Sequence, residues 1–398
     1  MKWRNILIVF LFFLAGFLAY NYFEQPFLKY FPEPVIDQPT EGVEETEQNL
    51  DLPELSTREK LTQMLMLPLV LDNEQDPADN DNLALIQEYQ PGFVVYFGEE
   101  IDFATAKKYQ ESLLDANNKK IVLPLLAVDH EGGRVQRLSG EGFTPLPSMR
   151  QLTNAVSSID EEQDTNPLNA RERRKLFNQS AKELSEVGIN LVLAPMVDYS
   201  VVSHPVLADR IGNNPDKIVQ IAQEYIVAFS NRQIMSVLKH FPGIGGSQKD
   251  LYLYADTVEL DQDDTLIFER LLDQYPNIGV MSAHLRLKDK LAGQACSLSK
   301  QCLDQLFQFY PEVLLITDDL LMESASYIPG TNEKKNLSTI AIEAIEAGNH
   351  VLLFGADFDY AQLNSLLDDL EAQYAESLDF QKLVNQASQK ILSLKGYQ

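Results

Sequence analysis

The pattern that most restricts the fold is an alternation of short apolar runs with amphipathic segments, which extends from residue 57 to the end of the chain. Short, continuous apolar runs are typical of strands that are buried on both faces, as in a parallel sheet covered by helices. The eight runs that we interpret as strands are Met64–Leu71, Gly92–Phe97, Leu123–Val128, Asn190–Ala194, Ser236–Lys239, Gly279–Ala283, Val313–Thr317 and His350–Phe354.

The segments between these runs have helical periodicity. They are Thr105–Ala116, Arg171–Val187, Asp216–Asn231, Leu266–Gln274, Ser299–Phe309 and Leu337–Ala347, and Leu378–Leu394 is interpreted as a closing helix. Eight strands separated by helices predict an α/β fold, a single-domain (β/α)8 barrel of the TIM type with some long loops. A doubly wound open sheet is the alternative, but no G-x-G-x-x-G motif follows the first strand.

The composition restricts the partners of the chain. Its formal net charge of -27 argues against nucleic acid or an anionic lipid surface as a partner, because repulsion would dominate at long range. The only two cysteines, Cys296 and Cys302, can form one local disulfide in an oxidising compartment or remain two free thiols. No group of Cys and His has the spacing of a metal site, so we expect neither a metal nor another cofactor.

The N-terminal segment has the order of an export signal. Lys2 and Arg4 precede an apolar run, Ile6–Tyr20, and no small-x-small cleavage site is clear. We interpret residues 1–23 as an uncleaved signal anchor, with a cleaved signal peptide as the alternative and a buried helix as a weaker one. The basic residues would hold this end in the cytoplasm and place the remainder outside the cell membrane. Residues 24–56, with several prolines and an acidic run, predict an extended linker before a domain at 57–398.

Polar side chains follow several of the predicted strands directly, where a barrel carries its binding and catalytic groups. In chain order these are Asp129–Arg137, Asp198 with the loop His204–Arg210, Lys239 with His240, His284, and Asp318 with Asp319. Carboxylates accept hydrogen bonds from sugar hydroxyls, and Arg and Lys donate to hydroxyl or acyl oxygens. The pattern therefore indicates a carbohydrate site at the ends of the strands.

Three motifs carry a resemblance to a known family. They are Val128–Arg137 (VDHEGGRVQR), Lys239–Gly243 (KHFPG) and Thr317–Leu320 (TDDL), supported by Gly188–Leu191, Ala194-Pro195, Asp209-Arg210 and Ala283-His284. In this order they resemble the glycoside hydrolases of family 3, and above all the branch of single-domain β-N-acetylglucosaminidases (β-hexosaminidases) that act on peptidoglycan fragments. The motifs cover most of the predicted barrel.

The resemblance implies a role for each matching residue. Asp318 matches the catalytic nucleophile, which attacks the anomeric carbon so that the configuration is retained after water completes the reaction. The residues that match those holding the sugar's hydroxyls and N-acetyl group are Asp129, Arg137, Arg210, Lys239 and His240. For Glu131 two roles remain equally open: shaping its loop and contacting the ligand.

The chain departs from the family where the general acid/base is expected. Relatives carry this group as a His on the loop after the fifth strand, oriented by an Asp two residues earlier. Here Asp250 is retained, but the acid/base position is Tyr252 and the first loop His of the family pattern is Ile244. None of the five histidines of the chain lies between residues 244 and 256. Asp250, with a raised pKa, Tyr252 or a group from elsewhere remain as proton donors.

Two functions of different class follow from these residues. The first is an exo-acting, retaining β-glycosidase on N-acetylglucosamine-type sugars of cell-wall glycan fragments, anchored outside the cytoplasm, with an altered acid/base. The second is a catalytically silent relative that binds glycan or acts as a scaffold. A carboxylate retained at Asp318 together with the sugar-binding set favours the first. The oligomeric state is left open.

Overall fold

The computed structural model describes residues 54–116, 122–155, 168–288, 293–331 and 333–397. The segment interpreted as a signal anchor, 1–23, lies outside the described residues, as does the predicted linker up to residue 53. Within the described ranges, no helix has the length and apolar character needed to cross a membrane. The barrel domain falls within one compact unit, Asn49–Gln398.

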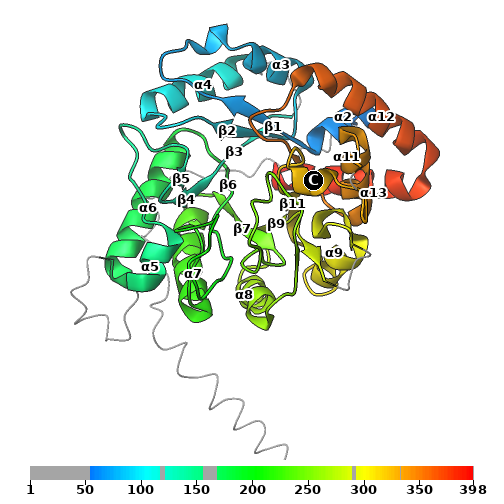
Figure 1. Cartoon of the computed structure of the whole chain (residues 1–398). Coiled ribbons are helices and arrows are strands. Elements are labelled where there is room, and N and C mark those ends of the chain that lie inside the picture. The colour runs from blue at the N-terminus through cyan, green and yellow to red at the C-terminus, as the bar shows by residue number, and fades with distance from the viewer. Residues whose placement is uncertain (1–53, 117–121, 156–167, 289–292, 332, 398) are drawn as a thin grey trace, which may run out of the picture. The chain divides into compact units, whose positions relative to one another are not determined.

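An eight-stranded parallel sheet forms the centre of this unit (Figure 1), in the order β11-β9-β7-β6-β3-β2-β1-β12. Its strands are β1 (Leu65–Val70), β2 (Phe93–Phe97), β3 (Leu125–Val128), β6 (Leu191–Val192), β7 (Met235–Phe241), β9 (Gly279–Ser282), β11 (Leu314–Thr317) and β12 (Leu352–Leu353). A parallel bridge between Ile316 and Val351 links the two ends of the order, so that the sheet is a nearly closed, TIM-like barrel. The expected α/β fold with eight parallel strands is confirmed.

Helices lie around the outside of the strands (Figure 1). They are α2 (Thr57–Gln63), α3 (Asp81–Tyr89), α4 (Phe103–Ala116), α5 (Met149–Ala155), α6 (Ala170–Glu186), α7 (Pro215–Ser230), α8 (Gln262–Leu272), α9 (Lys300–Phe307), α10 (Glu323–Ser326), α11 (Leu337–Ala347), α12 (Leu363–Glu376) and α13 (Leu378–Leu394). Arg58 of α2 pairs with Asp368 and Glu371 of α12, which fastens the start of the barrel to its end. Each predicted helix is present, but α2, α3, α5, α10 and α12 were not predicted.

The two shortest barrel strands are β6 and β12. Each has two paired residues, whereas longer strands were expected at Asn190–Ala194 and His350–Phe354. Ladder pairing at β6 stops before the cis peptide Ala194-Pro195, where a proline has no N–H to donate. Two small paired units were also not predicted: the hairpin of β4 (His130–Gly132) with β5 (Val135–Gln136), and the pair β8 (Thr257–Val258) with β10 (Arg286–Leu287).

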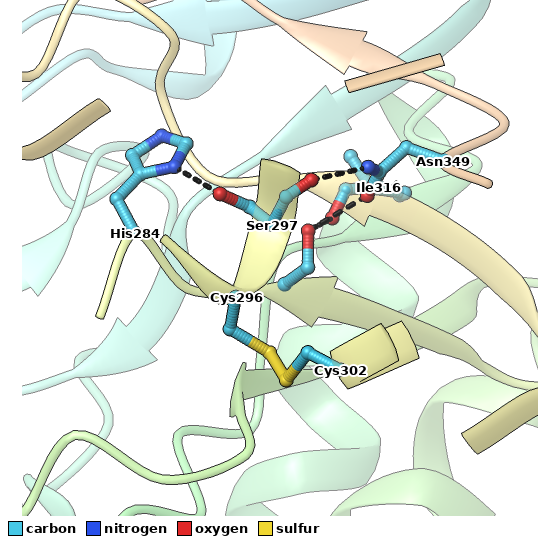
Figure 2. Close-up of a disulfide and its surroundings, with 7 residues drawn as sticks. His284, Cys296, Ser297, Cys302, Ile316 and Asn349 are labelled. Carbon is cyan, nitrogen blue, oxygen red and sulfur yellow. Dashed lines mark hydrogen bonds between the residues drawn. A yellow bond between two sulfur atoms is a disulfide. The ribbon is translucent and has the colours of Figure 1, made fainter. Parts of the chain in front are cut away.

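The two cysteines form a disulfide, which decides between the two states left open by the sequence. The bond joins Cys296 in the 3-10 turn η3 (Cys296–Leu298) to Cys302 in α9 (Figure 2). Both residues are buried in the apolar core. The bond therefore fixes the turn that follows β10 against the helix that leads to β11.

We predict that replacing Cys296 and Cys302 together by Ala lowers the free energy of unfolding by about 2 kcal/mol, because the unfolded chain regains the entropy of a short loop. The six-residue separation of the cysteines limits the effect. Equilibrium unfolding in urea of the oxidised wild type and the double variant measures the difference. Equal midpoints for the two proteins would show that the bond contributes nothing to stability.

Candidate active site

The carboxyl ends of the barrel strands bring polar side chains from distant parts of the sequence to one rim. Asp129 follows β3, Lys239 and His240 lie within β7, and Asp318 follows β11 directly. The β4–β5 hairpin, whose tip contains Gly132 with φ +89°, folds back so that Glu131 joins the same rim. Parallel strands of a barrel all end on this face, which is why residues far apart in sequence meet there.

Two cations and two carboxylates form a buried network on this rim. The Lys239 Nζ lies 2.7 Å from Asp129 Oδ1 and 2.7 Å from Glu131 Oε1. Arg210 donates to both oxygens of Glu131, at 2.8 and 2.7 Å, in a bidentate pair. The Lys239 and Glu131 side chains are each 3% exposed, so neither charge is solvated by bulk water. Each charge is therefore neutralised by its neighbours.

The network determines the protonation states of its members. Burial alone would raise the pKa of Glu131, but the charges of Arg210 and Lys239 outweigh burial and hold that pKa well below its usual range. Burial alone would lower the pKa of Lys239, yet Asp129 and Glu131 keep it above its ordinary value. Both groups therefore stay ionised at neutral pH, and the rim presents fixed charges to a ligand.

His240 is oriented by a fully buried carboxylate. Asp198 Oδ2 lies 2.8 Å from His240 Nδ1 and also accepts the backbone N–H of His240, while Asp198 Oδ1 accepts the N–H of Ile244. An ionised carboxylate only accepts hydrogen bonds, so Nδ1 carries a proton and Nε2 is the free nitrogen. Nε2 lies 3.9 Å from Asp318 Oδ2. His240 thus faces the predicted nucleophile.

The paired acids Asp318 and Asp319 have different environments. Asp319 Oδ1 accepts the N–H groups of Leu321 and Gly355, and burial raises the pKa of this carboxyl to about 6. Asp318 Oδ1 accepts the N–H of Asp319 at 2.8 Å, and Asp318 Oδ2 is the oxygen near His240. Asp319 therefore binds the backbone of two loops, at Leu321 and Gly355, whereas Asp318 presents an oxygen to the rim.

The loop that carries Asp250 and Tyr252 is a compact turn. Asp250 Oδ1 accepts the N–H of Tyr252, and the Asp250 carbonyl accepts the N–H groups of Leu253 and Tyr254. The Leu251 and Tyr252 carbonyls in turn accept the first N–H groups of α10. The loop after β7 is thus fastened to the helix that follows Asp318.

Tyr252 interacts electrostatically with the acidic rim. Its surface is 56% exposed, but burial of the phenol raises its pKa, and the charges of Asp318, Asp319 and Asp129 raise it further. Tyr252 therefore lies near enough to the acidic rim for these charges to act on its hydroxyl, although much of its surface is exposed. The hydroxyl therefore keeps its proton at any working pH.

Arg137 is the cation of the rim with the fewest contacts. Its guanidinium carbon lies 5.7 Å from the centre of the Phe97 ring at the end of β2. Its Nε is buried and lacks a hydrogen-bond partner within the described part of the chain. A buried donor without a partner is costly, so this group is suited to a ligand oxygen.

The rim unites several residues singled out in the sequence. Asp129, Arg210 and Lys239 share one network, and His240 meets Asp318. Asp250 is fixed by its own turn. Glu131 and Asp198 are among the polar residues near strand ends, but neither was included in the predicted site. Glu131 lies within β4 and Asp198 in the loop after β6, and no local spacing indicates that they hold Arg210 and His240.

A parallel barrel with buried acids and bases at its carboxyl rim has the arrangement of a barrel-type enzyme. The chain belongs to glycosyl hydrolase family 3, whose N-terminal domain matches residues 56–394. The resemblance stated from the sequence motifs is thereby confirmed at the level of the family.

The chain is also related to bacterial beta-hexosaminidases. It is 30% identical to a beta-hexosaminidase of Tolumonas auensis over 326 residues, which cover 79% of this chain and 90% of the relative. A beta-hexosaminidase of Thioalkalivibrio sulfidiphilus is 31% identical over 231 residues, 56% of this chain and 62% of that protein. The solved structure of a family 3 glycosyl hydrolase from Mycobacterium smegmatis has a TM-score of 0.69 at 25% identity and covers 85% of this chain and 97% of its own.

We predict that Lys239→Met lowers the free energy of unfolding by about 3–5 kcal/mol, because it leaves the Asp129 carboxylate without its cation and removes one of the two cations at the buried Glu131. Urea denaturation monitored by circular dichroism measures the loss. Arg270→Met is the matched control, since Arg270 pairs with the exposed Asp216 at 2.7 Å, and its loss costs less than about 1 kcal/mol. Equal losses for the two variants would contradict a structural role for the network.

Proposed function

We propose that this protein is an exo-acting, retaining β-glycosidase on N-acetylglucosamine-type sugars of cell-wall glycan fragments, with Asp318 as the nucleophile. The observation that carries the proposal is the Asp318 carboxylate, which stands at the end of β11 with Oδ2 directed to the rim. The sugar class is supported by the relatives, which are beta-hexosaminidases. No cofactor is required by this chemistry.

In the first step, an Asp318 oxygen attacks the anomeric carbon while the bond to the leaving oxygen breaks, and a glycosyl ester of Asp318 forms. In the second step, water attacks the same carbon and releases Asp318 as a carboxylate. Two inversions at one carbon retain the configuration. The leaving oxygen takes up a proton in the first step, and the attacking water loses one in the second.

The rim supplies groups of the right polarity for the sugar. Asp129 accepts hydrogen bonds from hydroxyls, while Lys239 and Arg210 donate to ring substituents from the same network. Arg137 offers its unpartnered guanidinium to the N-acetyl or a hydroxyl oxygen. His240, held by Asp198, presents Nε2 beside the anomeric centre. Because these groups are buried and mutually fixed, they need little reorganisation when the sugar binds.

For the proton donor we propose Asp250 rather than Tyr252. The raised pKa of Tyr252 keeps its hydroxyl protonated, which suits a hydrogen bond to the leaving oxygen but not the acceptance of a proton from water. Ile244, at the place of the family's first loop His, is buried and carries no proton. Of the two carboxyls of the loop, Asp256 is held by Ser247, Gln248 and Lys249. Asp250 is half-buried and accepts the N–H of Tyr252.

The loop that carries Asp250 also offers a surface for a second sugar, the one that leaves when the glycosidic bond is cleaved. Tyr252, Leu253 and Tyr254 form an exposed apolar surface on the turn that is fastened to α10. Aromatic faces are suited to the apolar C–H faces of pyranose rings, and isolated exposed patches of this kind mark binding sites. We therefore assign this surface to the part of the glycan beyond the cleaved bond.

We further propose that the barrel works outside the cytoplasm, held to the membrane by residues 1–23, with a secreted form as the alternative. The order of charges and apolar residues in this segment supports the proposal. The Cys296–Cys302 disulfide supports it as well, because such bonds persist in oxidising compartments. The membrane contact would be confined to the N-terminal segment.

A catalytically silent, glycan-binding protein is the second candidate function. It is favoured by Ile244 and Tyr252, which replace both loop histidines of the family pattern. Loss of general acid catalysis costs about 10²–10⁴-fold, and substrates with good leaving groups recover most of that loss. An activated substrate therefore separates the two candidates.

We predict that the wild type hydrolyses an aryl N-acetyl-β-glucosaminide with retention, and that Asp318→Ala lowers kcat by at least about a thousandfold. Release of the aryl group measures the rate, and proton NMR of the first sugar product gives its configuration. The control is Asp319→Asn, which keeps the Oδ1 acceptor for Leu321 and Gly355. If wild type and Asp318→Ala are equally inert while both bind the sugar, the glycan-binding candidate is correct.

We predict that Asp250→Asn slows hydrolysis of a natural disaccharide by about a hundredfold or more but changes the rate on the activated aryl glycoside little. Asn keeps the Oδ1 that accepts the Tyr252 N–H, so the turn is preserved. Steady-state rates on the two substrates give the ratio, with Tyr252→Phe as a parallel variant. Equal losses on both substrates would exclude Asp250 as the acid.

A further inference from the structure

We propose that His284 and Ser297 are a positioning pair for the nucleophile: through two hydrogen-bonded routes that meet at Ser297 they hold both ends of the Asp318–Asp319 segment. The inference rests on the proposed function of Asp318. Neither residue touches the rim network, and both are fully buried. Their role would be to set where the Asp318 carboxylate stands.

The first route runs through side chains. His284 Nε2 lies 2.9 Å from the carbonyl oxygen of Asp319, and His284 Nδ1 lies 2.6 Å from Ser297 Oγ. A carbonyl oxygen only accepts, so Nε2 carries the proton and Nδ1 accepts from the Ser297 hydroxyl. The Asp319 carbonyl thus selects the Nε2–H tautomer, and the Ser297 hydroxyl stabilises it by donating to Nδ1.

The second route runs from the backbone of Ser297 (Figure 2). The Ser297 carbonyl accepts from Asn349 Nδ2 at 2.7 Å, and Asn349 Oδ1 accepts from Ser282 Oγ at 2.7 Å. The Ser282 carbonyl then accepts the N–H of Asp318 at 2.9 Å. The N–H of Asp318 and the carbonyl of Asp319 are therefore both connected to one serine.

Burial keeps the imidazole in the required form. It lowers the pKa of His284, although the charge of Asp318 and the bond to Asp319 oppose the shift and His240 adds to it. A neutral ring has one N–H, and the hydrogen bonds described above leave no second proton to accommodate. In this form Nδ1 accepts one hydrogen bond, and the Ser297 hydroxyl donates it.

Ser297 is itself held in place from three directions. Its N–H donates to the Ala283 carbonyl, and the N–H of Cys296 donates to the Leu285 carbonyl, which places the turn alongside His284. The neighbouring Cys296 is bonded to Cys302 in α9 (Figure 2). Because both cysteines are buried, a reductant does not reach the sulfurs in the folded protein, and the bond keeps the turn attached to α9.

A pair of substitutions at His284 tests the first route. The amide nitrogen of Gln reaches the place of Nε2, whereas that of Asn reaches only the place of Nδ1. We expect His284→Asn to lower kcat on the aryl glycoside about tenfold with KM changed less than about twofold, the loss of one buried hydrogen bond. His284→Gln should retain most of the activity. Equal losses in the two variants would overturn the positioning role.

A second variant tests the contact between Ser297 and His284 without reference to activity. In protein labelled with ¹⁵N at histidine, the wild-type His284 should show the Nε2–H form with a hydrogen-bonded Nδ1, and Ser297→Ala should keep this form but move the Nδ1 resonance to that of an unbonded nitrogen. Ser324→Ala is the matched control, because the Ser324 hydroxyl is buried and has no hydrogen-bond partner among the described residues. It should change neither the spectrum nor kcat.

These experiments separate the two proposals. A wild type that is inert on the aryl glycoside would reject the proposed function, and the NMR spectra would still decide whether Ser297 donates to His284 Nδ1. An unchanged Nδ1 resonance in Ser297→Ala would reject the pair even in an active enzyme. A shifted Nδ1 resonance with unaltered kcat would show that the pair does not position the nucleophile.

Discussion

The structure of the rim depends above all on the ion pairs that Lys239 and Arg210 form with the Glu131 carboxylate. Transfer of four charged groups from water into a barrel end is costly, and only close, bidentate contacts offset that cost. The contacts join β7 to the β4–β5 hairpin and to Arg210 in the loop after β6. The position of His240, next to Lys239 in the chain, follows from the same contacts.

The strand count, the parallel barrel and most of the rim followed from the sequence, because each buried strand is a continuous apolar run with a polar residue after it. Asp198 and Glu131, whose contacts could not be predicted, act on other protein groups rather than on a ligand. Asp198 holds His240, and Glu131 holds two cations, so neither has a spacing that marks a partner far away in the chain. Contacts between distant segments are set by the barrel, and a local pattern carries no information about them. The helix α12 did have a readable period, at Leu363, Leu366, Leu367 and Leu370, and could have been predicted.

The proposed nucleophile, Asp318, and the proposed proton donor, Asp250, are held in place by different contacts. Asp318 stands on a barrel strand whose backbone is connected on both sides to buried side chains. Asp250 stands on a turn that is fastened mainly by main-chain bonds to α10. Main-chain bonds tolerate a change of side chain, so this loop can exchange its acid/base without disturbing the sugar-binding rim. The chain thus departs from the family pattern at Tyr252, in a loop whose attachment to α10 does not depend on that side chain.

The two replaced histidine positions differ in how easily the change could be reversed. Ile244 is 5% exposed, and its N–H is already bound to Asp198, so an imidazole there would be buried without a prepared partner. Position 252 opens to solvent and keeps the aspartate two residues before it. A histidine at position 252 would therefore need only a substitution at the surface, whereas a histidine at position 244 would have to fit into a packed interior.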